Sequence, residues 1–253
     1  HCVTRRQRQM CIRDSSNINF NLENEKYKLE TGFTAYESLS KQNSDRYQYV
    51  LPYFDFSGSF FDDSNFASFN FLSQGDNILK DTNSLRSRMI NNLKIQSYDF
   101  FSINGFKNNF NYHLKNTITA GKNNIEYDSS PHIKFMNIFE VISSFPLIDE
   151  SENYTNYLSP KVSFRFNPSD MKSYKNKNRE INNDNLFDID RLGLIDTLES
   201  GQNLTLGLDF KKEKISEINK YFELKLGKVL RTKTNSNLPT NSTLDKKLSL
   251  IHI

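Results

Sequence analysis

Strict alternation of apolar and polar residues is the feature of this chain that most limits how it can fold. Five segments place a large apolar residue at every second position, namely residues 17–22, 109–115, 161–167, 203–210 and 221–227. Successive side chains of a β-strand point to opposite faces, so each segment predicts a strand with one apolar and one polar face. Less regular alternation predicts further strands at residues 27–39, 47–56, 66–72, 93–101 and 133–145.

Short runs rich in Asn, Asp, Glu and Gly separate these segments and predict turns. The longest polar stretch, Asn167–Asp184, has no apolar periodicity and predicts an extended, solvated loop. Helical patterning is scarce, and Asp81–Asn92 is the candidate for a short helix. We therefore expect an all-β, antiparallel transmembrane barrel of roughly ten to twelve strands in this chain, partial in the sense of an open half-barrel or curved sheet.

The two ends carry a different kind of signal. Met10–Ser15 is what one strand of a transposase mosaic-end adapter encodes, and Leu248–Ile253 is what the complementary strand encodes. Sequences of this origin are excluded from fold reasoning. We therefore predict that residues 1–15 and 248–253 are adapter-derived, that residues 1–15 are disordered, and that residues 16–247 form the partial barrel domain.

Setting these ends aside changes the charge and the cysteine count. Leaving out four arginines and one aspartate reduces the 33 basic and 30 acidic residues to 29 of each. The basic arm that could have indicated nucleic acid is thereby lost, and nucleic acid is not an expected partner. Both cysteines, Cys2 and Cys11, are also lost. Residues 16–247 therefore hold no disulfide, no thiol nucleophile and no cysteine-ligated metal.

The composition favours a membrane barrel over disorder. Apolar residues make up only 36% of the chain, yet aromatic residues make up 13%. Disordered chains are poor in aromatic residues. A chain that is polar on average but rich in Phe and Tyr suits strands with an apolar face toward lipid and a polar face toward a wet lumen. A soluble β-sandwich or solenoid also alternates and is the competing interpretation.

Residues 157–210 resemble the barrel region of the LptD family of lipopolysaccharide-assembly proteins. The resemblance consists of a Leu-x-Pro strand start, a long polar loop, an Asn-Leu-Phe segment, and an Arg-x-x-Gly-x-Asp-type turn followed by Glu-x-Gly. The residues that carry it are Leu158, Pro160, Asn185, Leu186, Phe187, Arg191, Asp196, Glu199 and Gly201. Two flanking segments agree, Asp45–Pro52 with a strand ending in Leu-Pro, and Leu238–Asp245. We expect these motifs to fix loop geometry rather than to contact a ligand.

The resemblance implies a barrel in the cell outer membrane that inserts lipopolysaccharide into the outer leaflet, without enzymatic activity and without a cofactor. It further implies three partners: lipopolysaccharide with the surrounding outer-membrane lipid, an LptE-like plug lipoprotein and an LptA-like periplasmic bridge. The polar residues Asn109, Asn111, His113 and Lys115 are candidates to face the lumen. Two alternatives stay open: a passive porin or TonB-dependent receptor barrel, and a surface structural or adhesive β-protein.

Chemical motifs are weak throughout, and we predict no catalytic or metal site. Asp184, Asp188 and Asp190 have the spacing of a sparse calcium loop, but the glycine and glutamate of an EF-hand are missing. His113 and His132 have no spacing that indicates a hydrolase. The basic run Lys172–Arg179 could attract the phosphates of lipid A by charge, although such a run is more often a solvated loop.

Overall fold

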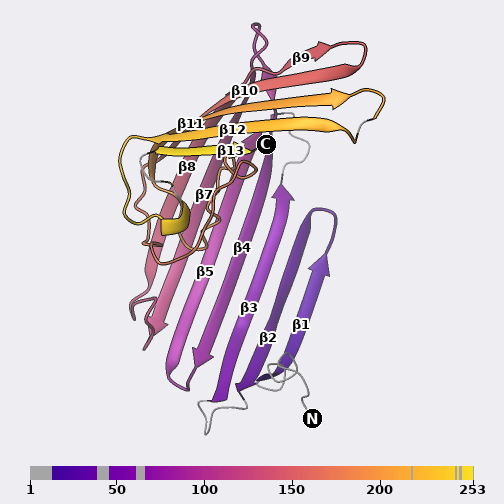
Figure 1. The fold of residues 1–253 in the computed structure, drawn as a ribbon. Coiled ribbons are helices and arrows are strands. Elements are labelled where there is room, and N and C mark those ends of the chain that lie inside the picture. Colours follow the sequence, from indigo (N-terminus) through magenta and orange to yellow (C-terminus); the bar gives the residue numbers. More distant parts are fainter. Residues whose placement is uncertain are drawn as a thin grey trace, which may run out of the picture. The chain divides into compact units, whose positions relative to one another are not determined.

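The computed structural model describes residues 13–38, 46–60, 66–217, 219–242, 244 and 247–252, and it is built almost entirely from antiparallel β-strands (Figure 1). The strands of the amino-terminal half are β1 (Arg13–Glu23), β2 (Tyr27–Ser38), β3 (Tyr47–Phe60), β4 (Ala67–Lys80), β5 (Ser84–Ser97), β6 (Phe100–Phe101) and β7 (Lys107–Lys122). Those that follow are β8 (His132–Ser144), β9 (Leu147–Glu150), β10 (Tyr154–Asn167), β11 (Gly201–Lys214), β12 (Tyr221–Arg231) and β13 (Lys247–His252). A 3-10 turn at Thr240–Ser242 interrupts the last connection.

The strands hydrogen-bond in the order β1-β2-β3-β4-β5-β7-β8-β10-β11-β12-β13, with β6 on β7 and β9 on β10. This up-and-down order confirms the expected all-β, antiparallel fold class. The sheet is not closed, because β1 and β13 are the two ends of the path among the described strands. By contact density the chain divides into a first unit (residues 1–62, 69–93 and 115–135) and a second unit (63–68, 94–114 and 136–253), which we describe separately.

In the first unit, the predicted helix at Asp81–Asn92 is wrong, because these residues form a hairpin turn and the start of β5. Asp81 and Thr82 have φ angles of 49° and 59°, and with Asn83 they form the turn between the end of β4 at Lys80 and the start of β5 at Ser84. Such a turn closes β4 directly onto β5. The residues after it form strand β5 and not a helix.

Proline positions explain two further differences. The strand expected at residues 47–56 continues as β3 to Phe60, so Leu51-Pro52 lies inside it, and its pairing with β4 shifts register between Val50 and Tyr53. Proline lacks the N–H that a regular ladder needs, so it is accommodated at an irregularity. In the second unit, Pro160 lies within β10 rather than near its start. It sits where the partner of β10 changes from β9, paired at residues 155–158, to β8, paired at residues 161–166.

The ends of the described chain are more ordered than expected. Arg13–Ser15 belong to β1 and pair with Tyr36–Ser38 of β2, and residues 248–252 belong to β13, which pairs with β12. The predicted disorder is therefore not found at residues 13–15, because an extended backbone can pair with a neighbouring strand whatever the origin of its sequence. The origin of these ends stays a prediction, and residues 1–12 and 253 lie outside the described part.

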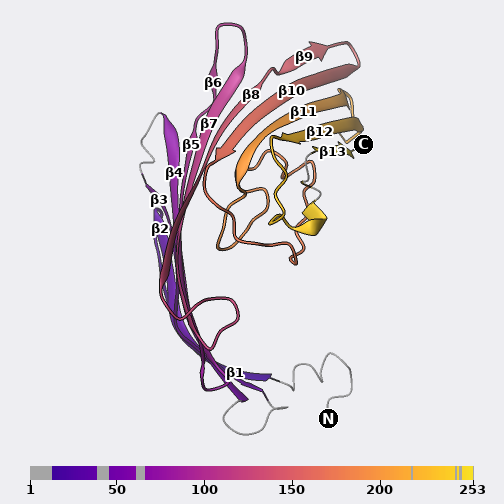
Figure 2. The ribbon, with the colours of Figure 1, turned by 90° about the vertical axis from the view of Figure 1, so that its left-hand side faces the viewer.

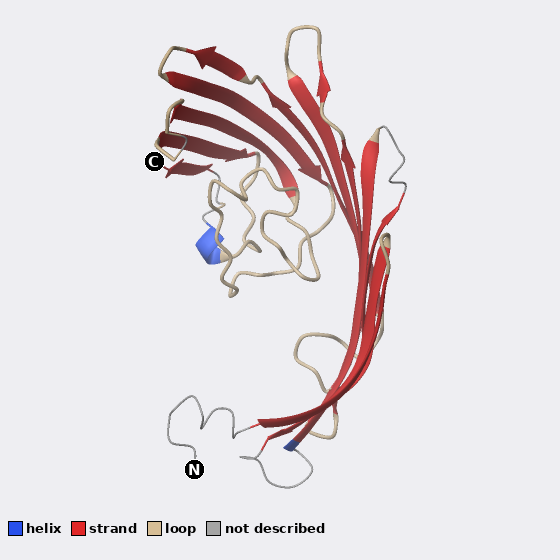
Figure 3. Cartoon of the chain, turned by 90° about the vertical axis from the view of Figure 1, so that its right-hand side faces the viewer, coloured by secondary structure: helices blue, strands red, loops and turns tan. Residues whose placement is uncertain are grey.

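The second unit carries a large insert on one face of its strands. We call residues 168–200, 232–242 and 244 the insert: the first part connects β10 to β11, and the others follow β12. Two views at right angles to that of Figure 1 both place these loops together on one side of β10, β11 and β12 (Figures 2 and 3). Residues 168–184 form a loop, as expected, and most of them are exposed, but the side chains of Met171 and Ile181 are buried and anchor it.

Candidate functional site: a charged strand face covered by the insert

Strands β8, β10 and β11 show an inverted pattern of burial. In β10, Phe164 is 49% exposed, while its neighbours Ser163 and Arg165 are each 1% exposed. In β8, Phe139 is 52% exposed and Glu140 is 1% exposed. The exposed apolar side chains therefore lie on the open face of these strands. The covered face carries the charged side chains and, in β8, the buried apolar residues Met136 and Ile138. We call the covered face the inner face.

A row of polar residues crosses four strands on the inner face. Glu140 of β8 is directly opposite Arg165 of β10, and Arg165 is opposite Asn203 of β11. Asn203 is in turn opposite Arg231 of β12. Arg165 Nη2 donates to Glu140 Oε1 at 2.7 Å, and Glu140 also accepts from Ser163 Oγ at 2.8 Å. We call these four residues the cross-strand row.

The insert contributes two charges that complete this row. Arg191 donates to Glu199 through two bonds, from Nε to Oε2 at 2.8 Å and from Nη2 to Oε1 at 2.7 Å. Glu199 also accepts from Arg231, and its carboxylate lies 3.6 Å from Arg165 Nη1. Glu199 therefore bridges the insert to two arginines of the sheet. We call Glu199, Arg191 and the cross-strand row the ionic latch.

Electrostatics keep Glu199 ionised in this buried place. Burial alone would raise the pKa of its carboxyl group, but Arg191, by charge and hydrogen bonds, and then Arg165 and Arg231 lower that pKa to about 2. The latch holds three arginines and two glutamates, so it carries one excess positive charge. Among the described residues, Arg165 Nε, Arg165 Nη1 and Arg231 Nε have no hydrogen-bond acceptor. A buried network of this kind costs desolvation energy that its attraction offsets only in part.

A second anchor of the insert is apolar. Gly207 of β11 and Gly227 of β12 are directly paired and face the insert. A Cβ added at Gly207 would lie 2.6 Å from the ring of Phe187, and one added at Gly227 would clash with the side chain of Leu186. The two glycines thus form a flat seat that admits Leu186 and Phe187. We call this contact the glycine seat.

The insert has an apolar core of its own. Of eight buried residues in the largest apolar cluster among the described residues, Val229 alone belongs to a strand. The others come from the two connections, namely Met171, Ile181, Leu186, Leu192, Leu194, Leu238 and Leu244. Hydrogen bonds join the two parts of the insert as well: Asn237 Nδ2 donates to the Met171 carbonyl at 3.2 Å, and Asn235 Nδ2 donates to Ser200 Oγ at 2.7 Å.

The remaining motif residues predicted from the sequence hold the conformation of the insert or adjoin it. Asn185 exchanges hydrogen bonds with Asn182, which closes a local turn. Asp196 accepts from Lys172 Nζ at 2.7 Å and from the Tyr174 hydroxyl at 2.6 Å, so part of the basic run is already paired within the insert. Gly201 starts β11 with a φ of 94°, a conformation that favours glycine. Leu158 lies in β10, opposite Phe210.

The four candidates for a lumen-facing position lie on one face of β7. Asn111 donates from Nδ2 to Glu140 Oε2 at 3.2 Å and to Asn109 Oδ1, so these two residues share the inner face with the latch. His113 and Lys115 are 0% and 2% exposed. Those two side chains are therefore closed off from solvent rather than lining an open path.

Sequence reasoning missed the residues of the sheet that receive the insert. Glu140, Arg165 and Arg231 stand on polar faces of predicted strands, but their meeting depends on the register between strands, which alternation alone does not give. Gly207 and Gly227 interrupt the polar faces of their strands, and that interruption is the available signal. Glycine within a strand often marks a close approach of other groups.

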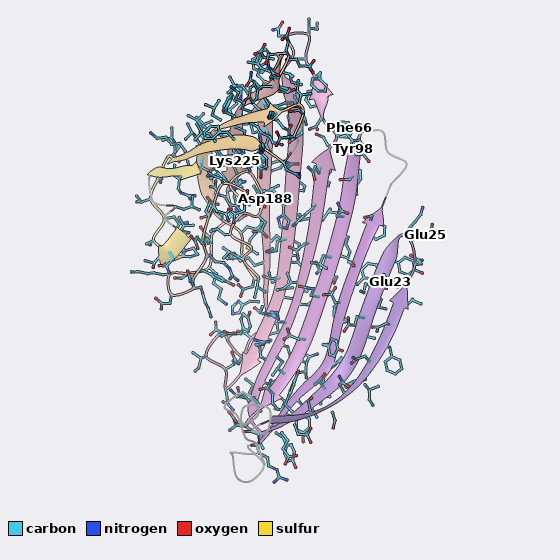
Figure 4. The ribbon with its side chains drawn as sticks, turned by 45° about the vertical axis from the view of Figure 1, so that its right-hand side comes forward. Glu23, Glu25, Phe66, Tyr98, Asp188 and Lys225 are labelled. Atoms are coloured by element: carbon cyan, nitrogen blue, oxygen red, sulfur yellow. The ribbon has the colours of Figure 1, made fainter. Side chains whose placement is uncertain are left out.

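Ligand-binding features of other kinds are sparse. Within the described ranges, no group of three His, Cys, Asp or Glu side chains is placed to hold a metal ion. Asp184 lies 3.6 Å from Lys225 Nζ, and the Asp188 carbonyl accepts from Arg165; Figure 4 labels Asp188 and Lys225. Burial raises the pKa of the Asp188 carboxyl group, partly against the charge of Arg165. No helix of the described part is long and apolar enough to cross a membrane.

No protein-family model matches the chain, and no curated protein matches it. The resemblance to the LptD family therefore rests on the sequence motifs alone. The contacts of the motif residues described above do not depend on that resemblance.

Proposed function

We propose that this chain is part of an outer-membrane β-barrel that moves lipopolysaccharide to the outer leaflet. The observation that carries the membrane part is the inverted burial in β8, β10 and β11. Val162, Phe164 and Leu206 are 36–49% exposed, while Ser163, Arg165 and Thr205 between them are each 1% exposed. A strand in lipid needs this arrangement, with apolar residues outside and polar residues inside.

The lipopolysaccharide part is supported by the motif resemblance and by the chemistry of the inner face. Lipopolysaccharide joins acyl chains to phosphorylated sugars, so a path for it needs polar and cationic groups along one face. The inner face offers such groups beyond the latch, including the Lys161–Asp209 pair and the Lys225–Glu223 pair at 3.1 Å. As a hypothesis, the sugar portion passes along this face while the acyl chains leave between strands into the bilayer.

The membrane part is tested by introducing charge on the open face. Phe164→Lys and Leu206→Lys are each expected to destabilise a lipid-embedded barrel by about 2–4 kcal/mol at mid-depth. The full chain, reconstituted in lipid vesicles, would be titrated with urea and followed by heat-modifiable gel migration. Lys212→Gln is the matched surface control at the end of β11. If both lysine variants fold as well as the parent, the open face does not contact lipid.

The lipopolysaccharide part is tested by photocrosslinking. A photoreactive residue at Lys161, on the inner face, is expected to capture lipopolysaccharide in cells, whereas one at Leu206, on the open face, is expected to capture phospholipid. Steady ion conductance without capture at position 161 would instead favour a passive porin or receptor barrel. Extraction of the protein without detergent would favour a surface adhesive protein.

A further inference from the structure

We propose that the insert is a plug that leaves the inner face as a folded unit. Three contacts attach it to the strands: the ionic latch, the glycine seat, and an apolar contact of Leu198 with Met136 and Ile138 of β8. The inference deepens the proposed function by naming what regulates access to the polar face, and it rests on that function only for the identity of the cargo. It depends on how the insert is built and on how it is attached.

The insert can keep its structure when it detaches. In the larger apolar cluster its buried residues pack mainly against one another, since Val229 is the one strand residue there. Leu198 instead packs against Met136 and Ile138 of β8. Its two parts are joined by Asn237 with Met171 and by Thr240 Oγ1 with the Lys175 carbonyl at 2.8 Å. Few of these contacts involve a strand, so most of them persist after undocking.

The attachment to the sheet combines the charged latch with two small apolar contacts, the glycine seat and the contact of Leu198 with Met136 and Ile138. Arg191 and Glu199 stand on the insert side, and Glu140, Arg165 and Arg231 stand on the strand side. Charged groups regain hydration when separated, whereas apolar groups do not. A polar attachment with a partial desolvation penalty therefore opens more readily than an apolar core of the same area. A pocket of about 550 Å³ lined by Arg231, Gln202 and Lys233 brings solvent to one edge of the latch.

The glycine seat gives the plug its position. Leu186 and Phe187 can lie flat on β11 and β12 because no side chain stands at Gly207 or Gly227. A single methyl group at Gly227 would meet Leu186, and shortening Leu186 would relieve that conflict. The seat and the latch are both needed for docking, since they hold different parts of the segment 185–200.

The test uses a cysteine reporter beneath the plug. Cys2 and Cys11 are the two cysteines of the chain, and replacing both by serine leaves a background for Ser163→Cys, a near-isosteric change at a side chain that is 1% exposed. Labelling by a charged maleimide is measured on the full chain in lipid vesicles. Ser173→Cys, on an exposed position of the insert, controls for reagent quality.

Glu199→Gln and Gly227→Ala are each expected to raise the labelling rate at position 163 by about tenfold or more, because each removes one attachment. Glu217→Gln, which changes an exposed carboxylate paired with Lys214, is the matched control and should leave the rate unchanged. Adding Leu186→Ala to Gly227→Ala should restore protection. Heat-modifiable migration of every variant must stay that of the parent.

Unchanged labelling in both variants overturns the proposal, because the insert would then be held by other contacts. The proposal is also overturned if the variants lose both the protection of position 163 and their heat-modifiable migration. The insert would then be an inseparable part of the barrel core. Neither result depends on lipopolysaccharide. If labelling shows that the plug moves but photocrosslinking captures no lipopolysaccharide, the proposed cargo is refuted and the plug proposal still stands.

Discussion

Strands β1–β3 and strands β10–β12 have the same alternation of apolar and polar residues, but their side chains differ in solvent exposure. In β1–β3, Gly32 is the one buried position among the described residues, and Ile18 and Phe20 are 62% and 61% exposed beside exposed asparagines. In β10–β12, every polar residue of the cross-strand row is buried. The difference comes from the insert, which covers one sheet face in the second case.

Alternation therefore decides which side chains share a face, but not whether that face is exposed to solvent or buried. The first unit illustrates the wetter case: Arg86 and Arg88 pair with Asp76, and these side chains stay 15–23% exposed. Arg165 and Glu140, at 1% and 0%, illustrate the drier case. The energetic consequence of removing one charge should therefore differ strongly between the two units.

The largest expected effect is that of Arg165→Met. The change leaves Glu140 buried without its cation, and we expect a loss of about 3–5 kcal/mol in the free energy of unfolding. Urea titration of the full chain in lipid vesicles measures it. Lys214→Met, which removes an exposed pair with Glu217, should change the free energy by less than about 0.5 kcal/mol. A small loss for Arg165→Met would mean that water reaches Glu140.

Acid should weaken the second unit through Glu199. Its pKa is lowered from 4.5 to about 2, so ionised Glu199 stabilises the folded state above pH 4.5, and that stability is lost as pH falls toward 2. The full loss corresponds to about 3 kcal/mol. Urea titrations between pH 6 and pH 2 measure it, and the pH slope should be reduced in Glu199→Gln. An equal slope in parent and variant would contradict the assignment to Glu199.

Replacing a glycine by alanine should destabilise the protein more at the glycine seat than in strands β1–β3. Gly207→Ala places a methyl group against Phe187 and should cost about 1–3 kcal/mol. Gly58→Ala in β3 is the matched control, because its nearest neighbours would lie 3.4–3.5 Å away, in ordinary contact. Thermal unfolding of both variants gives the comparison. If both variants lose the same stability, Gly207 is not needed to admit Phe187.

The smallest expected effect is that of Asp76→Asn. Asp76 Oδ1 accepts from Arg86 Nη2 at 3.0 Å, but water screens this partly exposed cluster, so we expect a loss of about 1 kcal/mol or less. The loss should shrink further in high salt. Urea titrations at low and high salt measure both effects. A salt-independent loss as large as that of Arg165→Met would erase the distinction between the units.

Alternation by itself determined the strand content, the antiparallel fold class and the composition of each face, because successive side chains of a strand must point to opposite sides. The family resemblance, and not alternation, singled out residues 185–201 as a segment with motifs that fix loop geometry. The sequence pattern misassigned Asp81–Asn92, since a turn with two positive φ angles is hard to recognise in the pair Asp81-Thr82, which lacks glycine.

Only the tertiary structure decided that Arg165, Glu199 and Arg231 meet and that Leu186 and Phe187 rest on paired glycines. These contacts join residues that are far apart in the sequence; Arg231 and Glu199, for example, are separated by 32 positions. Strand register and loop placement set such distances, and both depend on the packing of the whole second unit. The charged face of the strands is buried because the insert, whose first part connects β10 to β11, folds onto it.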